Sequence, residues 1–314
     1  MTRHDPPATA AAERAGIARR FGLDPASPLA ARVRPTSPEI LARFDEVRRP
    51  GQPGPTEHRL TAGERRALSA AFAALPPLHQ RLLRERLRGV NFLDGMPNTA
   101  LTSTVNPGEP YELFDITIRA AVLRQTASEW LTEKERTVFD AAGTKGSVSV
   151  EAGRRDALVF ILLHEATHVV DNCLGLTPPF PPGKPPQGAP PPPPPPTEFT
   201  RGVWDDRMLP APAYRDALRL RVRFFPGGEQ LPIDRAVAVY ESLRRTPFAS
   251  LYGGWNWSDD LAEYLSVYHW TEVLKQPYRI VIRDGDRDVV AYEPMKSSLV
   301  RGRIGQMKRF YEEG

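Results

Sequence analysis

A strongly hydrophobic stretch near the middle of the chain, residues 156–175, reads DALVFILLHEATHVVDNCLG. Its interior contains no proline or glycine, and its length allows about five helical turns. Asp156 is suited to cap the start of a helix, and Gly175, with two prolines shortly after it, is suited to end one. The pattern predicts one long helix that is largely buried.

Other stretches repeat hydrophobic residues with the period of a helix. Helices are predicted over 61–75, 77–88, 131–143, 234–245, 259–274 and 298–311. In a capping box, a threonine and a glutamate three residues later accept hydrogen bonds from each other's backbone N–H. Two predicted helix starts have this spacing, Thr61 with Glu64 and Thr132 with Glu135. Ser258 is the expected cap of the helix over 259–274.

Extended structure is expected where β-branched residues and turn signals alternate. Two or three strands are predicted within 90–122, and a short strand is predicted over 146–150. Residues 278–294 have the pattern of a hairpin with Asp284-Gly285 at its turn. The chain therefore combines helices with a small number of strands.

Composition sets two segments apart. Residues 1–60 are rich in proline, alanine and arginine, and we predict a loosely attached N-terminal extension. Residues 177–197 include seven consecutive prolines, which cannot enter a helix or a central strand, so an exposed polyproline segment is expected. This segment is a candidate docking site for a proline-recognising partner, or a flap near a cleft. The rest of the chain falls into residues 61–176 and 198–314.

The overall composition excludes several classes of protein. The 314 residues are enough for one large domain or two small ones. The net charge is +4, but the arginines are scattered among acidic residues, and no nucleic-acid-binding motif is visible. No hydrophobic run approaches a membrane span, and no signal peptide is visible, so a cytoplasmic location is expected unless an export leader was removed. The single cysteine, Cys173, is expected in the core.

The hydrophobic stretch contains one motif that carries chemistry, H-E-x-x-H, at His164, Glu165 and His168. Positions four apart lie on one face of a helix, so the two imidazoles can bind one metal ion. Glu165 is turned about 100° round the helix, where it reaches a water molecule near the ion but not the ion itself. Buried polar side chains without partners are costly, and a bound metal removes that cost. The pattern predicts a zinc site.

A catalytic zinc site takes three protein ligands, so a third one is needed. We predict Glu263 on the helix that follows Ser258, with Asp171 and His269 as its rivals. Asp259 and Asp260, one turn before Glu263, are candidates to accept the second ring N–H of a ligating histidine, or else to cap their own helix. The same orienting role is predicted for Asp171, which lies on the helix face that carries both histidines.

The motif H-E-A-T-H at residues 164–168, with a later glutamate in D-L-A-E-Y around Glu263, resembles the glutamate-type zincin metallopeptidases, or gluzincins. The longer run H-E-A-T-H-V-V-D is also similar to the branch that contains the Mlc titration factor and anthrax lethal factor. The matched residues cover about a tenth of the chain, and only the first segment is specific. The resemblance implies an α+β, zincin-like fold, with a small twisted sheet packed on the motif helix (within 61–176), a mainly helical second lobe (198–314) and a cleft between them.

The resemblance also implies the activity. A zinc ion held by His164, His168 and Glu263 would activate a water molecule for attack on a peptide bond of a peptide or protein substrate. Glu165 would move the proton of that water to the leaving amine. A further hydrogen-bond donor is expected to stabilise the oxyanion. The candidates are Tyr252, Tyr264, Tyr268 and His269.

Two other functions fit the same sequence. In one, the chain binds zinc without proteolysis and acts as a binding module whose proline-rich segment recruits partners. In the other, it hydrolyses an amide other than a peptide bond. A Glu165→Gln variant separates the first from a peptidase, because an enzyme would lose its turnover while keeping metal and fold.

Overall fold

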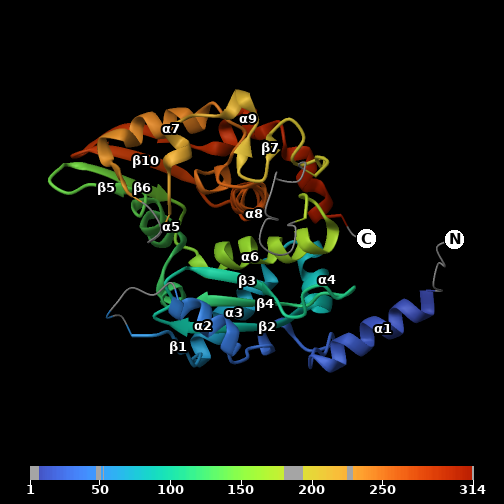
Figure 1. Ribbon diagram of the computed structural model, residues 1–314. Coiled ribbons are helices and arrows are strands. Elements are labelled where there is room, and N and C mark those ends of the chain that lie inside the picture. Colours follow the sequence, from blue (N-terminus) through green and yellow to red (C-terminus); the bar gives the residue numbers. More distant parts are fainter. Residues whose placement is uncertain (1–6, 47–50, 52, 180–193, 225–228, 313–314) are drawn as a thin grey trace.

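The structure is a computed structural model that describes residues 7–46, 51, 53–179, 194–224 and 229–312. Helix α6 (Ala157–Leu174) crosses the middle of the molecule (Figure 1). One sheet with several helices lies on one side of α6, and a second sheet with further helices lies on the other. This mixture of helices and small sheets confirms the expected α+β class.

Helix α6 is the long buried helix that the hydrophobic pattern predicts. Asp156 makes no side-chain capping bond, but the helix ends as expected at Gly175, whose φ of 61° is readily adopted by glycine. Contrary to the expectation that no hydrophobic run approaches a membrane span, α6 has the length and hydropathy of one, alone among the described helices. However, 78% of this 18-residue stretch is buried inside the protein. This burial fits the central helix of a hydrophobic core.

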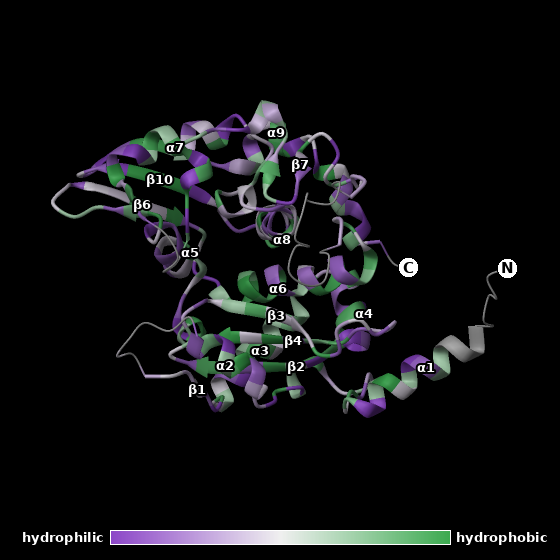
Figure 2. Cartoon of the chain, viewed as in Figure 1, coloured by the Kyte–Doolittle hydropathy of each residue, from purple (hydrophilic) through white to green (hydrophobic). Residues whose placement is uncertain are grey.

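The first sheet has the strand order β1-β2-β4-β3 and lies against α6. Its strands are β1 (Thr56–Glu57), β2 (Leu87–Asp94), β3 (Ala100–Thr104) and β4 (Phe114–Arg119). The central strands β2 and β4 run parallel and are almost continuously buried, while β3 runs antiparallel to β4 at the edge. Figure 2 shows that β2, β4 and α6 are rich in hydrophobic residues. The motif helix is therefore covered by a small sheet, as predicted.

The second sheet has the order β11-β10-β6 and joins distant parts of the chain. Its strands are β6 (Gly146–Glu151), β10 (Arg279–Asp284) and β11 (Arg287–Tyr292). The β10–β11 hairpin turns at Asp284-Gly285, as predicted. Because β6 pairs antiparallel with β10, segments before and after α6 share one sheet. The two halves in space therefore differ from the predicted division into residues 61–176 and 198–314.

Helices pack around both sheets and around α6. They include α3 (Ala62–Ala73), α4 (Pro77–Arg86), α5 (Ala127–Arg136), α7 (Ala236–Arg244), α8 (Trp257–Tyr268) and α9 (Ser298–Arg301). Two short strand pairs complete the second half, namely β5 (Phe139–Asp140) with β9 (Leu231–Pro232) and β7 (Trp204–Asp206) with β8 (Leu209–Pro210). Helix α5 packs on β6, and α8 packs directly on α6. The contact between α6 and α8 creates the site described below.

Two helix starts differ from the prediction because other residues cap them. The capping box of α3 is formed by Thr61 and Glu64, as expected. Helix α5 begins four residues early, because its box is formed by Thr126 and Glu129. Helix α8 is capped by Asn256, whose side-chain oxygen accepts from two backbone N–H groups, and not by Ser258.

Three helix ends also differ from the prediction. Helix α5 ends at Arg136 and not at residue 143, and strand β5 begins at Phe139. After Tyr268, α8 continues as a wider π-helical turn over His269–Val273. The terminal helix predicted over 298–311 is divided into α9 and a 3-10 helix over Ile304–Phe310, with Gly302 between them. Glycine destabilises the interior of a helix, and this accounts for a break at Gly302.

Much of the predicted N-terminal extension belongs to the folded body. Val33 forms a parallel bridge with Val90 of β2. Phe44, on α2 (Pro38–Glu46), is 1% exposed and packs with buried residues of the first half. These contacts contradict the expectation of a loose attachment for this part of residues 1–60.

Only the first part of that segment stands apart. Helix α1 (Pro7–Arg20) projects from the body (Figure 1). Its last turn is held by Ile17, which packs with Leu23 and Tyr111. The expected polyproline segment falls mostly on residues 180–193, which lie outside the described residues.

A buried carboxylic acid in the second half makes stability depend on pH. Glu135 of α5 is 1% exposed and accepts a hydrogen bond from the hydroxyl of Tyr240. Burial raises the pKa of Glu135 to about 7, although Tyr240 and the charge of Lys134 partly oppose the effect of burial. An unfolded glutamate titrates near 4.5, so the folded state binds more protons between pH 4.5 and 7. Stability from this group is therefore lost as the pH rises through that range.

We expect Glu135→Gln to remove this loss, because the amide keeps an acceptor for Tyr240 and does not ionise. Relative to wild type, the free energy of unfolding of the variant should rise by about 2–3 kcal/mol between about pH 5 and pH 8. Urea unfolding at the two pH values measures it, with Glu13→Gln on the exposed part of α1 as the control. An equal difference between variant and wild type at both pH values contradicts the expectation.

Candidate metal centre

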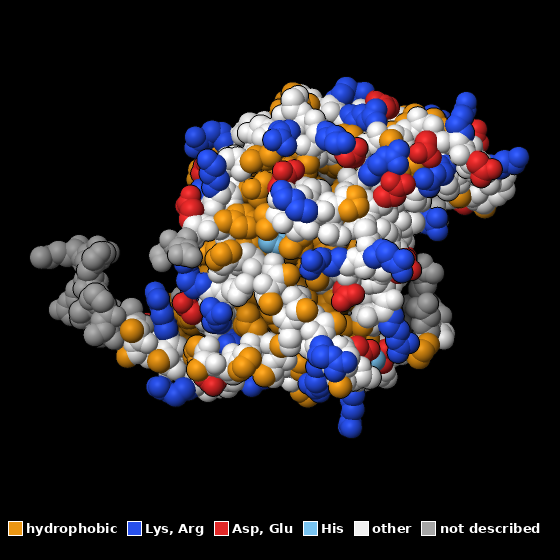
Figure 3. Space-filling model, turned by 180° about the vertical axis from the view of Figure 1, so that it is seen from behind, with side chains coloured by type: hydrophobic (Ala, Val, Ile, Leu, Met, Phe, Trp, Pro, Cys, Tyr) orange, Lys and Arg blue, Asp and Glu red, His pale blue; other side chains and the backbone are white. Residues whose placement is uncertain are grey.

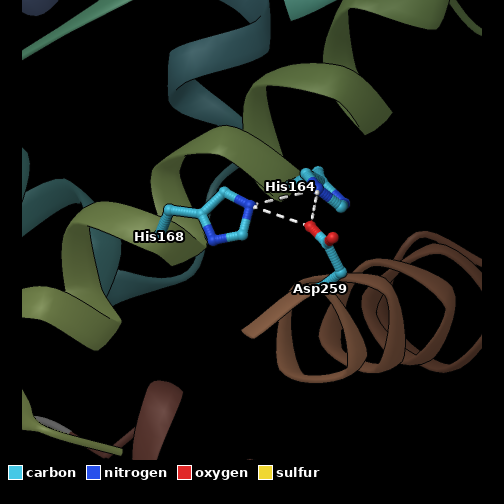
Figure 4. A group of neighbouring side chains, drawn as sticks. All are labelled: His164, His168 and Asp259. Carbon is cyan, nitrogen blue, oxygen red and sulfur yellow. Dashed lines mark hydrogen bonds and ion pairs between the residues drawn. The ribbon is translucent and has the colours of Figure 1, made fainter. Parts of the chain in front are cut away.

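His164 and His168 lie one turn apart on α6 and turn their rings toward the same point (Figure 4). Their Nε2 atoms are 3.2 Å apart, and the ring planes meet at 81°. Both side chains are on the side of α6 that faces α8. The spacing of the motif therefore brings the two imidazoles together, as the helical period predicts.

The third side chain at this point is Asp259 of α8 (Figure 4). Its Oδ1 lies 3.6 Å from Nε2 of His164 and 3.5 Å from Nε2 of His168. Asn256, the cap of α8, donates from Nδ2 to the other carboxylate oxygen at 2.5 Å. The helix cap therefore fixes the carboxylate with Oδ1 directed at the histidines.

The three ligand atoms have the separations that a tetrahedral ion requires. Zinc bonds of about 2.0–2.2 Å to nitrogen and oxygen, at tetrahedral angles, place ligand atoms about 3.3–3.6 Å apart. The separations here are 3.2, 3.5 and 3.6 Å. Two imidazoles and a carboxylate are a common catalytic zinc set and leave one position for water or substrate. The donor set therefore fits zinc in both chemistry and spacing.

Glu263, the predicted third ligand, lies on the other side of His164. Its Oε1 is 3.2 Å from Nδ1 of His164, which is the ring nitrogen turned away from the other ligand atoms. Lys134 bonds the same oxygen at 2.8 Å, and Ser250 donates to Oε2 at 2.6 Å. Asp259, one turn earlier on α8, takes the place expected for Glu263. The two carboxylates thus exchange their predicted positions, and Glu263 is placed to accept the Nδ1–H of His164.

His168 has a support of the same kind on its own Nδ1. Ser258 Oγ lies 3.3 Å from this atom and donates to Asp171 at 3.2 Å. Thr177 holds Asp171 in turn, with its backbone N–H at 2.7 Å and its hydroxyl at 2.6 Å. Ser258 is therefore placed to accept the Nδ1–H of His168 while its own proton goes to Asp171. The orienting role predicted for Asp171 is possible here through this one hydroxyl.

The carboxylates around His164 set the charge of the site. Burial lowers the pKa of His164, but the nearby Asp259 and Glu263 outweigh burial and raise it to about 9. Burial raises the pKa of Glu263, but Lys134 and His164 lower it to about 2. The histidines likewise hold the pKa of Asp259 below its usual range, against burial. The two carboxylates therefore favour the protonated form of the His164 ring.

Glu165 stands beside the three ligand atoms without joining them. The hydroxyl of Thr102, on the edge strand β3, donates to its Oε2 at 2.7 Å. Tyr252 packs beside His164, with ring centroids 5.8 Å apart. Burial, together with the charges of Asp259 and Glu165, raises the pKa of Tyr252 well above its usual value, so its hydroxyl remains a donor. Of the four predicted oxyanion stabilisers, Tyr252 is the one at the site.

Two other predicted stabilisers are hydrogen-bonded elsewhere in the core, which contradicts their predicted role. Tyr264 is fully buried and donates its hydroxyl to the backbone oxygen of Val300. His269 bonds the Tyr311 hydroxyl through Nδ1 and the backbone oxygen of Ala74 through Nε2. Both ring nitrogens of His269 are therefore engaged in the core, which also removes it as a rival metal ligand.

Asp260 is also remote from the histidines, against its predicted orienting role. It forms a buried ion pair with Arg303 at 2.8 Å and accepts from the indole of Trp204 at 2.9 Å. Neighbouring residues on a helix point about 100° apart, so Asp259 faces α6 while Asp260 faces the C-terminal segment. Tyr268, the remaining predicted stabiliser, packs its ring against Tyr311.

Several supporting side chains were not predicted from the sequence. One is Lys134, which is 4% exposed. The others are three hydroxyl groups that bond the side chains of the site, those of Thr102, Ser250 and Ser258. Lys134 follows Trp130 by four residues and so shares the hydrophobic face of α5, which is a usable signal in retrospect. The hydroxyl residues carry no such signal, because serine and threonine are common at helix starts and in strands.

Two cavities meet at the group formed by His164, His168 and Asp259. One, of about 340 Å³, and the other, of about 720 Å³, share His164 and Glu165 in their walls. His168 and Asp259 line the larger one. Figure 3 shows a hollow between the two halves, bordered by hydrophobic side chains, with a histidine surface at its centre. The side chains of His168 and Asp259 are 19% and 14% exposed, so the candidate site is accessible from outside.

Comparisons with known proteins assign no family. No protein-family model matches the chain. No curated protein and no solved structure matches it either. The likeness to zincin peptidases therefore depends on the motif and on the geometry around it.

Proposed function

We propose that this protein is a zinc-dependent peptidase, with His164, His168 and Asp259 as zinc ligands and Glu165 as the general base. One observation carries the proposal, namely that three ligand atoms at tetrahedral separations lie beside a carboxylate that does not join them. A structural zinc site is closed by a fourth protein ligand, whereas the described residues offer three. A zincin-like fold, with its sheet on the motif helix, belongs to the same proposal.

The chain's own residues divide the work of hydrolysis. A bound zinc ion supplies a Lewis acid that acidifies a water molecule and polarises the scissile carbonyl. Glu165, held by Thr102, accepts the proton of the attacking water and delivers it to the leaving nitrogen. Tyr252 donates to the developing oxyanion. Glu263 and Ser258 hold the Nδ1 atoms, so that both Nε2 atoms face one point.

The edge of β3 supports a peptide as the substrate. β3 is the terminal strand of its sheet, and Ala100, Leu101, Thr102 and Thr104 line the larger cavity. An extended peptide adds to such an edge through backbone hydrogen bonds. A chain bound along β3 would pass Glu165, because Thr102 is hydrogen-bonded to that carboxylate.

We expect the zinc-loaded protein to cleave a disordered protein substrate and to lose this activity when a chelator such as dipicolinate removes the metal. Added zinc should restore it, since the ligand set is preformed on two packed helices. Mass spectrometry of the new peptide termini measures cleavage, and inhibitors of serine and cysteine peptidases exclude contaminants. Cleavage that persists after zinc has been removed contradicts the proposal.

A further inference from the structure

The smaller cavity beside the metal centre is walled by aromatic rings. Its volume is about 340 Å³. The rings belong to Trp130, Phe224, Tyr252 and Trp255. Phe224 and Trp255 stand edge-on to Tyr252, with centroids 5.2 and 5.7 Å away. Glu165 and His164 also line the cavity, so a group bound in it would lie next to the reacting atoms.

The cationic side chain in this wall is already paired. Lys134 Nζ lies 2.8 Å from Glu263 Oε1, and the two side chains are 4% and 1% exposed. The same ammonium lies 4.3 Å from the centroid of the Tyr252 ring and 5.5 Å from that of Trp130. The charges of Lys134 and Glu263 therefore cancel within the wall, and aromatic surface dominates the rest of the lining.

We propose that this cavity binds one large uncharged side chain of the substrate, with aromatic side chains favoured, next to the scissile bond. The proposal rests on the peptidase function above. Ligand pockets span about 300–1,000 Å³, so a cavity at the low end holds a single side chain and not a length of chain. Edge-to-face contacts with the walls suit an aromatic ring. A charged side chain would give up its hydration in a cavity where Lys134 and Glu263 are already paired with each other and Glu165 is held by Thr102.

The test uses peptides with an alanine and glycine host and one variable position, occupied by phenylalanine, leucine, alanine, glutamate or lysine. Cleavage is measured with zinc-loaded wild type. Binding of the same peptides is measured by calorimetry with zinc-loaded Glu165→Gln, which is expected not to turn over. We expect the phenylalanine peptide to exceed the alanine peptide about tenfold or more in kcat/KM and in affinity, with glutamate and lysine lowest.

A cavity-filling variant links the preference to this place. Ala100 lies on β3 and lines the cavity, so Ala100→Phe should occupy it and remove most of the preference for phenylalanine over alanine. Ala291→Phe is the matched control, because Ala291 is exposed on β11, the edge strand of the other sheet. It should keep the wild-type preference. The wild-type peptide profile decides the matter if the Ala100 variant does not fold.

The two proposals fail separately in this design. Cleavage without side-chain preference, or with a preference for glutamate or lysine, overturns the pocket and leaves the peptidase standing. Selective binding of the phenylalanine peptide without any cleavage by wild type overturns the peptidase and leaves an aromatic binding pocket. If the protein shows no cleavage and no selective binding, both proposals are overturned.

Discussion

Replacing Asp259 by alanine is expected to empty the metal site. The binding free energy of zinc in such sites is about 10–16 kcal/mol from all ligands together. Removing one of three ligands should therefore weaken zinc binding a hundredfold or more, which corresponds to about 3 kcal/mol. Alanine suits the helix interior, so α8 should remain folded. Metal analysis after dialysis, and competition with a chromophoric chelator, measure the loss.

The comparison that decides the third ligand is Glu263→Gln. Glutamine keeps an oxygen that accepts the Nδ1–H of His164, so zinc affinity should fall by about 10–100-fold at most. Asp286→Ala, at the exposed turn between β10 and β11, controls for the loss of one carboxylate and should retain zinc fully. If Glu263→Gln loses its zinc while Asp259→Ala retains it, the third ligand is Glu263 and not Asp259.

Glu165→Gln is expected to abolish most of the hydrolysis while leaving the zinc in place. The amide cannot accept a proton from water, and general base catalysis accounts for about 10²–10⁴ in rate. Its oxygen still accepts from Thr102, so the side chain should keep its position. Measuring kcat/KM and zinc content on the same preparation gives both parts of the result, with Glu13→Gln as the control.

The possible outcomes separate the functions that the sequence leaves open. Full activity in Glu165→Gln would remove this residue from the mechanism. Loss of zinc together with activity would mean that the carboxylate binds the metal. A wild-type protein that holds zinc tightly and cleaves no peptide would favour the zinc-binding module, or hydrolysis of another amide, over a peptidase.

Short-range patterns predicted several local features of the fold correctly. The pair His164 and His168 converges because residues four apart share a helix face, whatever surrounds them. The Thr61 capping box and the turn at Asp284-Gly285 depend on the same kind of local bonding, and both form as expected. The start of α5 was misplaced because two threonines each have a glutamate three residues later, and spacing does not choose between them.

Long-range packing decided what spacing leaves open. Asp259 and Glu263 are four residues apart on one helix face, so the sequence offers either of them to the histidines. The crossing of α8 over α6 places the first turn of α8 at the Nε2 atoms and the second at Nδ1 of His164. Lys134, buried against Glu263, then neutralises that carboxylate.

The sequence by itself determined the helix, the convergence of the two imidazoles and the place of Glu165 beside them, because all three follow from one local period within eighteen residues. Only the tertiary structure decided which carboxylate lies against the two imidazoles, which tyrosine packs beside His164, and which rings wall the neighbouring cavity. Those residues come from separate segments, and their meeting depends on how helices and sheets pack, which no local period encodes.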